Sequence, residues 1–150
     1  MRALVMASVA LLLAACDEGV TPLPPDWSWN GISPPVRPTP LPPRVGRADV
    51  TYVPEGARGL SEVTSVEVRL RVSGIAGSAS VDAEFLAPGP AAYEKRTRTV
   101  EALPTEEREL VFSLPVAGTN LPLHGLSGTW EVRFFVDGVP LTTTSFTLER

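Results

Sequence analysis

Hydrophobic and polar residues alternate along most of the chain from about residue 44 onward. In segment 66–72, valine or leucine fills every even position, and the odd positions carry glutamate or arginine. The same alternation recurs at 81–85, 110–114 and 130–136. Successive side chains of a strand point to opposite faces, so this pattern predicts strands with one buried and one solvated face. No segment after residue 16 shows a hydrophobic stripe of helical spacing.

Turn-forming residues, mostly glycine and proline, separate these segments and divide the region into seven predicted strands. The predicted strands are 47–54, 62–73, 79–86, 92–101, 107–114, 129–137 and 140–149. Short strands at this spacing favour an antiparallel sandwich or barrel. The segment Gly128–Arg133, the Asp137-Gly138 turn and Phe146–Leu148 resemble the last two strands of many bacterial Ig-like domains. We therefore predict an all-β fold, a seven-stranded antiparallel Ig-like β-sandwich, without the paired cysteines of antibody domains.

The last predicted hairpin contains a conflict in its alternation. Asp-Gly at 137–138 is a favoured two-residue turn, and such a turn places Phe134 opposite Leu141. Phe146 has the opposite parity from Leu141, although both are expected to face the core. Because side chains alternate strictly, the register has to shift between them. The sequence predicts a β-bulge near 142–144.

The predicted strand 92–101 is polar on both faces. It contains Lys95, Arg96 and Arg98. Charges of this kind protect an edge strand from pairing with other chains, and we favour that interpretation. The alternative is a basic patch for an acidic partner.

The N-terminus has the organisation of a secretory signal. A positive start, Met1-Arg2, precedes an uncharged run that extends to Leu13. The tetrapeptide Leu13-Ala14-Ala15-Cys16 resembles the lipobox of bacterial lipoproteins. The resemblance implies a signal peptide at 1–15, lipid attachment at Cys16 and a domain held outside the cytoplasm. Asp17 resembles the residue that retains lipoproteins in the inner membrane of enteric bacteria, but this rule varies between lineages, so the choice of inner or outer membrane stays open.

Prolines dominate the segment that follows the cysteine. Nine of the 23 residues from Thr21 to Pro43 are proline, which favours an extended or irregular backbone. We therefore predict a lipidated cysteine and proline-rich linker at 16–45 and the sandwich domain at 46–150. Trp27 and Trp29 lie within this linker. They are candidates for docking a partner, although packing against the domain or the lipid headgroups is the favoured interpretation.

Charge and cysteine content narrow the classes of partner. Removal of Arg2 with the signal leaves 12 basic and 17 acidic side chains, a net charge of −5. This acidic balance argues against nucleic acid, whose binders usually carry a basic patch. Cys16 is the only cysteine, so no disulfide is expected. The expected partners are the membrane, through the lipid anchor, and unidentified envelope proteins.

Few residues suggest catalysis or metal binding. His124 is the only histidine, and no G-x-S-x-G motif accompanies it. Asp82 and Glu84 share a strand face. This arrangement fits a pair of glycosidase carboxylates, and it equally fits any solvated strand face. The carboxylates of Glu106, Glu107 and Glu109 lack the spacing of a calcium loop. We expect no catalytic residue, metal or cofactor.

The sequence therefore favours a non-enzymatic, membrane-anchored envelope lipoprotein that carries a protein-interaction or assembly module on a stalk. The alternative is a small-ligand or carbohydrate-binding module. That module would use Phe135, which faces outward by parity, together with the loop Asn120–His124. A hydrolase built on His124 and scattered carboxylates is the remote alternative.

Overall fold

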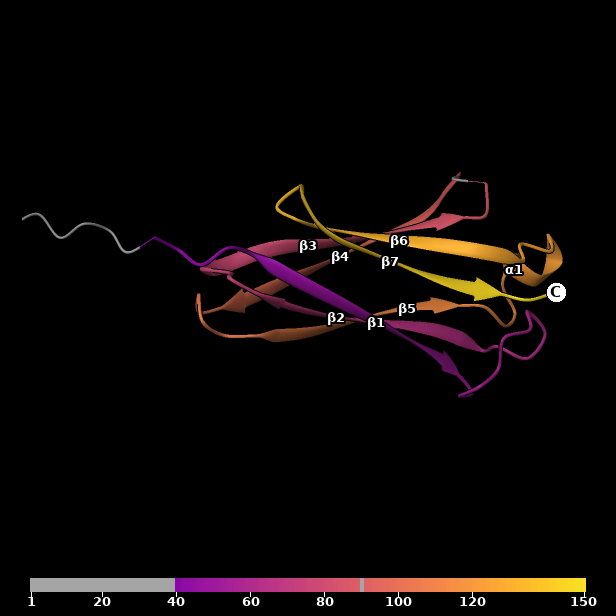
Figure 1. The fold of residues 1–150 in the computed structure, drawn as a ribbon. Helices are drawn as coiled ribbons and strands as arrows, with labels where there is room; N and C mark the ends of the chain where they lie inside the picture. The colour runs from indigo at the N-terminus through magenta and orange to yellow at the C-terminus, as the bar shows by residue number, and fades with distance from the viewer. Residues whose placement is uncertain (1–39, 90) are drawn as a thin grey trace, which may run out of the picture. The chain divides into compact units, whose positions relative to one another are not determined.

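The structure is a computed structural model that describes residues 40–89 and 91–150. These residues form seven strands and one helical turn (Figure 1). The elements are β1 (Val45–Val53), β2 (Ser65–Ser73), β3 (Gly77–Ala87), β4 (Ala91–Ala102), β5 (Arg108–Pro115), α1 (Asn120–Leu123), β6 (Gly128–Val136) and β7 (Val139–Leu148). All seven predicted strands are present, with ends within three residues of their predicted positions.

The strands form two antiparallel sheets that pack face to face. One sheet has the order β1-β2-β5 and the other the order β4-β3-β6-β7 (Figure 1). The predicted all-β, seven-stranded Ig-like sandwich is therefore confirmed. The fourth strand pairs with the third, whereas constant-type immunoglobulin domains place their fourth strand in the first sheet.

The core lies between the sheets and is apolar. Its largest fully buried side chains are Trp130, Phe85, Phe112 and Phe134. The Trp130 ring stacks on Phe146 with centroids 5.9 Å apart, and its indole N–H donates to the Leu126 carbonyl oxygen at 3.2 Å. No polar side chain is fully buried within 40–89 and 91–150. Apolar packing, without disulfides, therefore holds the two sheets together.

The β6–β7 hairpin has the predicted turn, but its bulge lies one residue earlier than predicted. Asp137 and Gly138 both have positive φ, 51° and 78°. Phe134 pairs with Thr142, so Leu141 is the extra residue, and the predicted pairing of Phe134 with Leu141 is wrong. The cause lies in β1, where a Cβ on Gly46 would lie only 2.5 Å from Leu141 Cδ2. Leu141 fills the space that the missing glycine side chain leaves open.

Within the described residues, helix α1 is the one regular element that the alternation did not predict. Its four residues make a single turn, which is too short to produce a periodic stripe. Leu121 is fully buried and fixes the turn to the core. No helix in the described part of the chain is long and apolar enough to span a membrane.

Candidate functional site

The outward-facing side of the β4-β3-β6-β7 sheet, called the outer face below, carries two rows of aligned side chains. Strand pairing places one residue from each strand in each row. The first row is Thr97, Asp82, Phe135 and Pro140. The second row is Lys95, Glu84, Arg133 and Thr143. The rows bring an aromatic ring, charged groups and hydroxyls together on one surface.

Asp82 is held by two side chains of β4 on the outer face. Thr97 Oγ1 donates to Asp82 Oδ1 at 2.6 Å, and Lys95 Nζ lies 3.0 Å from Asp82 Oδ2. The Thr97 hydrogen bond first, and then the Lys95 hydrogen bond, hold the pKa of Asp82 below its usual value. Lys95 Nζ also lies 3.7 Å from Glu84 Oε1. A carboxylate that is ionised and already bonded is a poor proton donor, so the Asp82–Glu84 pair does not resemble a glycosidase acid.

Phe135 borders an open depression along the β6–β7 hairpin. The depression has a volume of about 430 Å³. Its lining is Arg133, Phe134, Phe135, Pro140, Leu141, Thr142 and Thr143. Phe135 is partly exposed, as its parity predicted, while its neighbour Phe134 is buried in the core. Arg133 Nε donates to Glu131 Oε1 at 2.5 Å, which orients the guanidinium along the strand.

The structure separates the three basic residues of β4. Lys95 lies on the outer face, whereas Arg96 and Arg98 lie opposite Ala83 and Val81, on the side that faces the core. Arg96 pairs with Glu94 at 2.9 Å, and the Arg98 guanidinium carbon lies 5.9 Å from the Phe112 ring centroid. Charges that point inward at a sheet edge oppose pairing with another strand, which supports the edge-protection interpretation.

His124 takes a backbone role in the structure. It follows α1 directly, and its N–H donates to the Asn120 carbonyl oxygen at 3.0 Å. His124 is exposed, and its imidazole makes no hydrogen bond with any of the described residues. No group of three potential metal-ligating side chains occurs there either.

Two of the three glutamates considered for calcium, Glu106 and Glu109, form ion pairs with arginine. Glu106 Oε1 lies 2.9 Å from Arg108 Nη2, and Glu109 Oε2 lies 3.2 Å from Arg71 Nε. Glu106 also accepts the Leu103 N–H at 3.2 Å. These contacts make the two carboxylates parts of surface ion pairs.

The structure does not bring together the two halves of the predicted ligand site. Phe135 lies at the end of β6, next to the β6–β7 turn. The loop Asn120–His124 precedes the start of the same strand. A fully extended strand of this length separates the two by roughly 20 Å or more. They are therefore separate surfaces at opposite ends of the sandwich.

Leu123 protrudes from α1 and is 79% exposed. Hydrogen bonds on both sides of Leu123 hold the turn that carries it. Thr119 Oγ1 accepts the Leu121 N–H at 3.2 Å, and the Leu126 N–H donates to the Leu121 carbonyl oxygen at 3.0 Å. Figure 1 shows α1 and the C-terminus at one end of the sandwich, and the start of β1 at the other.

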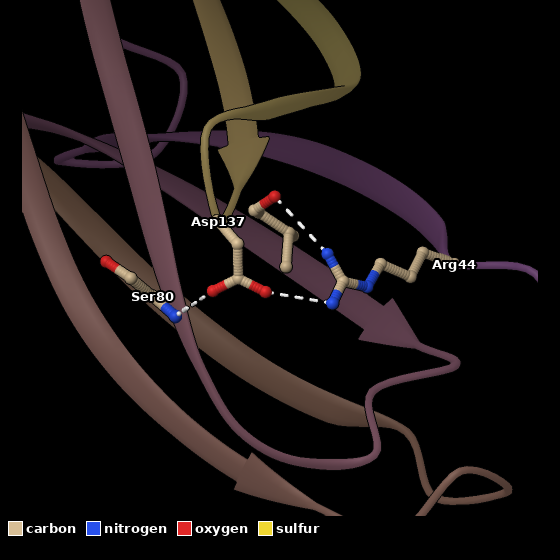
Figure 2. A network of polar contacts seen from close by, with 4 residues as sticks. Arg44, Ser80 and Asp137 are labelled. Carbon is tan, nitrogen blue, oxygen red and sulfur yellow. Dashed lines mark hydrogen bonds and ion pairs between the residues drawn. The ribbon is translucent and has the colours of Figure 1, made fainter.

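A polar network that the sequence patterns did not predict holds the start of β1. Arg44 Nη2 lies 2.8 Å from Asp137 Oδ2, and Arg44 Nη1 donates to the Val136 carbonyl oxygen at 3.3 Å (Figure 2). Asp137 Oδ1 accepts the Ser80 N–H at 2.9 Å, and the Asp137 N–H donates to the Ser80 carbonyl oxygen at 2.8 Å. Asp137 therefore joins β3, the β6–β7 turn and the segment that leads into β1.

The predicted lipid-attachment residue Cys16 and the docking candidates Trp27 and Trp29 lie outside the described residues.

The sequence matches no family model and no curated protein. Among solved structures, the chain is similar to an immunoglobulin-like protein from Pseudomonas aeruginosa. The two share 16% sequence identity and a TM-score of 0.42, over 73% of this chain and 98% of that one.

Proposed function

We propose that this chain is a lipid-anchored protein of the bacterial cell envelope, and that its Ig-like domain is a non-catalytic module for protein contact or assembly. The lipobox at Leu13–Cys16 supports the anchor, and the prolines of 16–45 support a spacer between anchor and domain. The observation that carries the contact role is the display of Leu123 at the end of the sandwich opposite the start of β1.

Leu123 suits a contact residue because its backbone is already ordered. The buried side chain of Leu121 and the hydrogen bonds around α1 hold the turn in place before any partner arrives. A residue that is ordered in advance loses less conformational entropy on binding. When a partner covers an apolar side chain that such a turn holds in water, the burial of its surface stabilises the complex.

The arrangement of charges supports a role without catalysis. Both outer faces of the sandwich carry ion pairs between neighbouring strands, such as Arg71 with Glu109 and Lys95 with Asp82. Catalytic groups instead need a nucleophile or base that is held free for substrate. Paired surface charges of this kind keep a domain soluble and direct its contacts.

The contact role is tested by crosslinking in membranes of the native host. The full-length protein carries a C-terminal tag, and Leu123→Ser is compared with Val139→Ser. Val139 is also an exposed apolar residue, 59% exposed, but it lies at the other end of β6 and β7. We expect one recurrent partner, lost in Leu123→Ser and retained in Val139→Ser. If the partner is lost only when Trp27 and Trp29 are replaced by alanine, the contact site lies in the linker and not at Leu123.

The anchor is tested separately. Cys16→Ala is expected to abolish incorporation of labelled fatty acid and to release the protein from the membrane fraction. The acyl chains are attached through Cys16, and sustained membrane attachment needs two or more of them. Labelling that survives this substitution would overturn the anchor without affecting the contact role.

A further inference from the structure

The depression along the β6–β7 hairpin has no role in the proposed protein contact, because it lies at the opposite end of β6 from Leu123. It contains a partly exposed phenylalanine, an arginine and a threonine hydroxyl on one solvated surface. Phe135 adds nothing to the core, because its neighbour Phe134 occupies the inward position. From these residues we propose that the depression is a binding site for a neutral hexopyranose ring of an oligosaccharide.

The shape and the apolar part of the site fit a sugar ring. Binding sites commonly have volumes of roughly 300–1,000 Å³, and the depression of about 430 Å³ falls within that range. It is shallow and open, which suits one face of a flat, partly hydrated ring. The Phe135 ring can cover the C–H face of a pyranose and remove apolar surface from water. Pro140, opposite Phe135 on β7, extends the apolar floor.

The polar groups around Phe135 match the hydroxyls at the rim of a sugar. Arg133 and Thr143 are directly opposite each other in the next row of the outer face. Glu131 engages the Nε of Arg133, so the terminal nitrogens of the guanidinium remain available as donors. Glu84 lies opposite Arg133 on β3, and its side chain is 37% exposed, so it supplies an acceptor. Donors and acceptors in a row beside an apolar platform determine the orientation of a ligand.

The charge of the surface favours a neutral sugar over an acidic one. The basic groups of the region are Lys95 and Arg133, and the acidic groups are Asp82, Glu84 and Glu131. Lys95 is already shared between two carboxylates, at 3.0 and 3.7 Å. An anionic sugar would therefore meet a net negative surface, on which the charge of Arg133 is already balanced by Glu131. Like charges disfavour such a complex.

The proposal is tested by isothermal titration of the full-length protein, purified in a detergent without sugar headgroups. The probes are tetrasaccharides of glucose, mannose and N-acetylglucosamine, with oligogalacturonate as the acidic probe. We expect at least one neutral tetrasaccharide to bind, at least tenfold more weakly to Phe135→Ala, and with wild-type affinity to Phe135→Trp. Leu123→Ala is the matched control and should bind as the wild type does. Thr143→Val leaves the phenyl ring in place and should weaken binding severalfold.

Two results would overturn the proposal. The first is that none of the neutral tetrasaccharides binds the wild-type protein. The second is that Phe135→Ala and Thr143→Val bind as tightly as the wild type. If Phe135→Ala lowers the melting temperature and no sugar binds the wild type, Phe135 serves only to pack against Pro140. None of these outcomes depends on the lipid anchor or on a partner at Leu123, so this inference and the proposed function fail separately.

Discussion

The hydroxyl of Tyr52 bonds to both backbone groups of Thr147. Tyr52 Oη accepts the Thr147 N–H at 3.1 Å and donates to the Thr147 carbonyl oxygen at 3.0 Å. β7 is an edge strand, and the outward N–H and C=O of an edge residue normally meet another strand or water. One side chain of β1 thus takes the place of a strand and joins the two sheets along this side.

Replacement of Tyr52 by phenylalanine removes this link and leaves the ring contacts. The Tyr52 ring packs edge-on against Phe146, with centroids 6.4 Å apart, and lies 3.7 Å from the Arg58 guanidinium carbon. We expect Tyr52→Phe to lower the free energy of unfolding by about 1 kcal/mol, since water can replace part of the hydrogen bonding that the Thr147 backbone groups lose. Urea unfolding measures the change. Tyr93→Phe is the control, because no hydrogen bond of the Tyr93 hydroxyl is found in the described residues, and an equal loss in both variants would contradict the account.

Gly74 is required by both its backbone angle and its neighbours. It has a φ of +78°, and a Cβ there would lie 2.3 Å from the Pro43 carbonyl oxygen. We expect Gly74→Ala to cost more than the roughly 1–2 kcal/mol of left-handed strain alone, because the segment before β1 must also move. Gly56→Ala is the matched control, since Gly56 has a φ of +86° and nothing lies within 4 Å of its Cβ position. Similar losses of unfolding free energy in the two variants would show that the close approach of Pro43 is unimportant.

Asp137 combines an ion pair with a turn role, and two substitutions separate them. Asp137→Asn keeps an oxygen for the Ser80 N–H and tolerates the φ of 51°, but it loses the ion pair with Arg44. The paired side chains are 40% and 43% exposed, so this loss is expected to cost less than about 1 kcal/mol. Asp137→Ala also removes the acceptor and is expected to cost about 2 kcal/mol.

Salt distinguishes the two effects at Asp137. In 1 M NaCl the difference between the wild type and Asp137→Asn should disappear, because exposed charges are screened. The difference between Asp137→Asn and Asp137→Ala should persist in chemical unfolding. A salt-insensitive loss in Asp137→Asn would show that the carboxylate acts through something other than Arg44.

The alternation of side chains predicted the strands because it reports which residues face the core. It also predicted that a bulge must separate Leu141 from Phe146. It could not place the bulge, because its position depends on Gly46, a residue of a distant strand whose missing side chain accommodates Leu141. Register within a strand is readable from sequence, whereas the fit between strands of different sheets depends on tertiary packing.

The same distinction applies to the candidate surfaces. The outward direction of Phe135 followed from parity alone. The alignment of Phe135 with Asp82 and Pro140 depends on strand pairing and was not predicted. The separation of Phe135 from Asn120–His124 was missed because loop residues have no period that fixes their position. The inward direction of Arg96 and Arg98 likewise depends on their pairing with β3.

The hydrogen bond from Thr97 to Asp82 gives a prediction for acid stability. The Thr97 and Lys95 hydrogen bonds lower the pKa of Asp82 from its ordinary value of 3.8. A carboxyl with a lower pKa in the folded state stabilises the fold above its ordinary pKa. That contribution is lost as the pH falls below 3.8 and through the folded-state pKa, because the unfolded chain then binds more protons.

Removing the Thr97 hydroxyl removes the largest cause of the lowering. We therefore expect Thr97→Val to be less stable than the wild type at neutral pH and to lose less of its remaining stability below pH 3.8. Urea unfolding between pH 7 and pH 2 measures this, with Thr99→Val as the control on the same strand. A wild-type acid dependence in Thr97→Val would show that Lys95 alone sets the ionisation of Asp82.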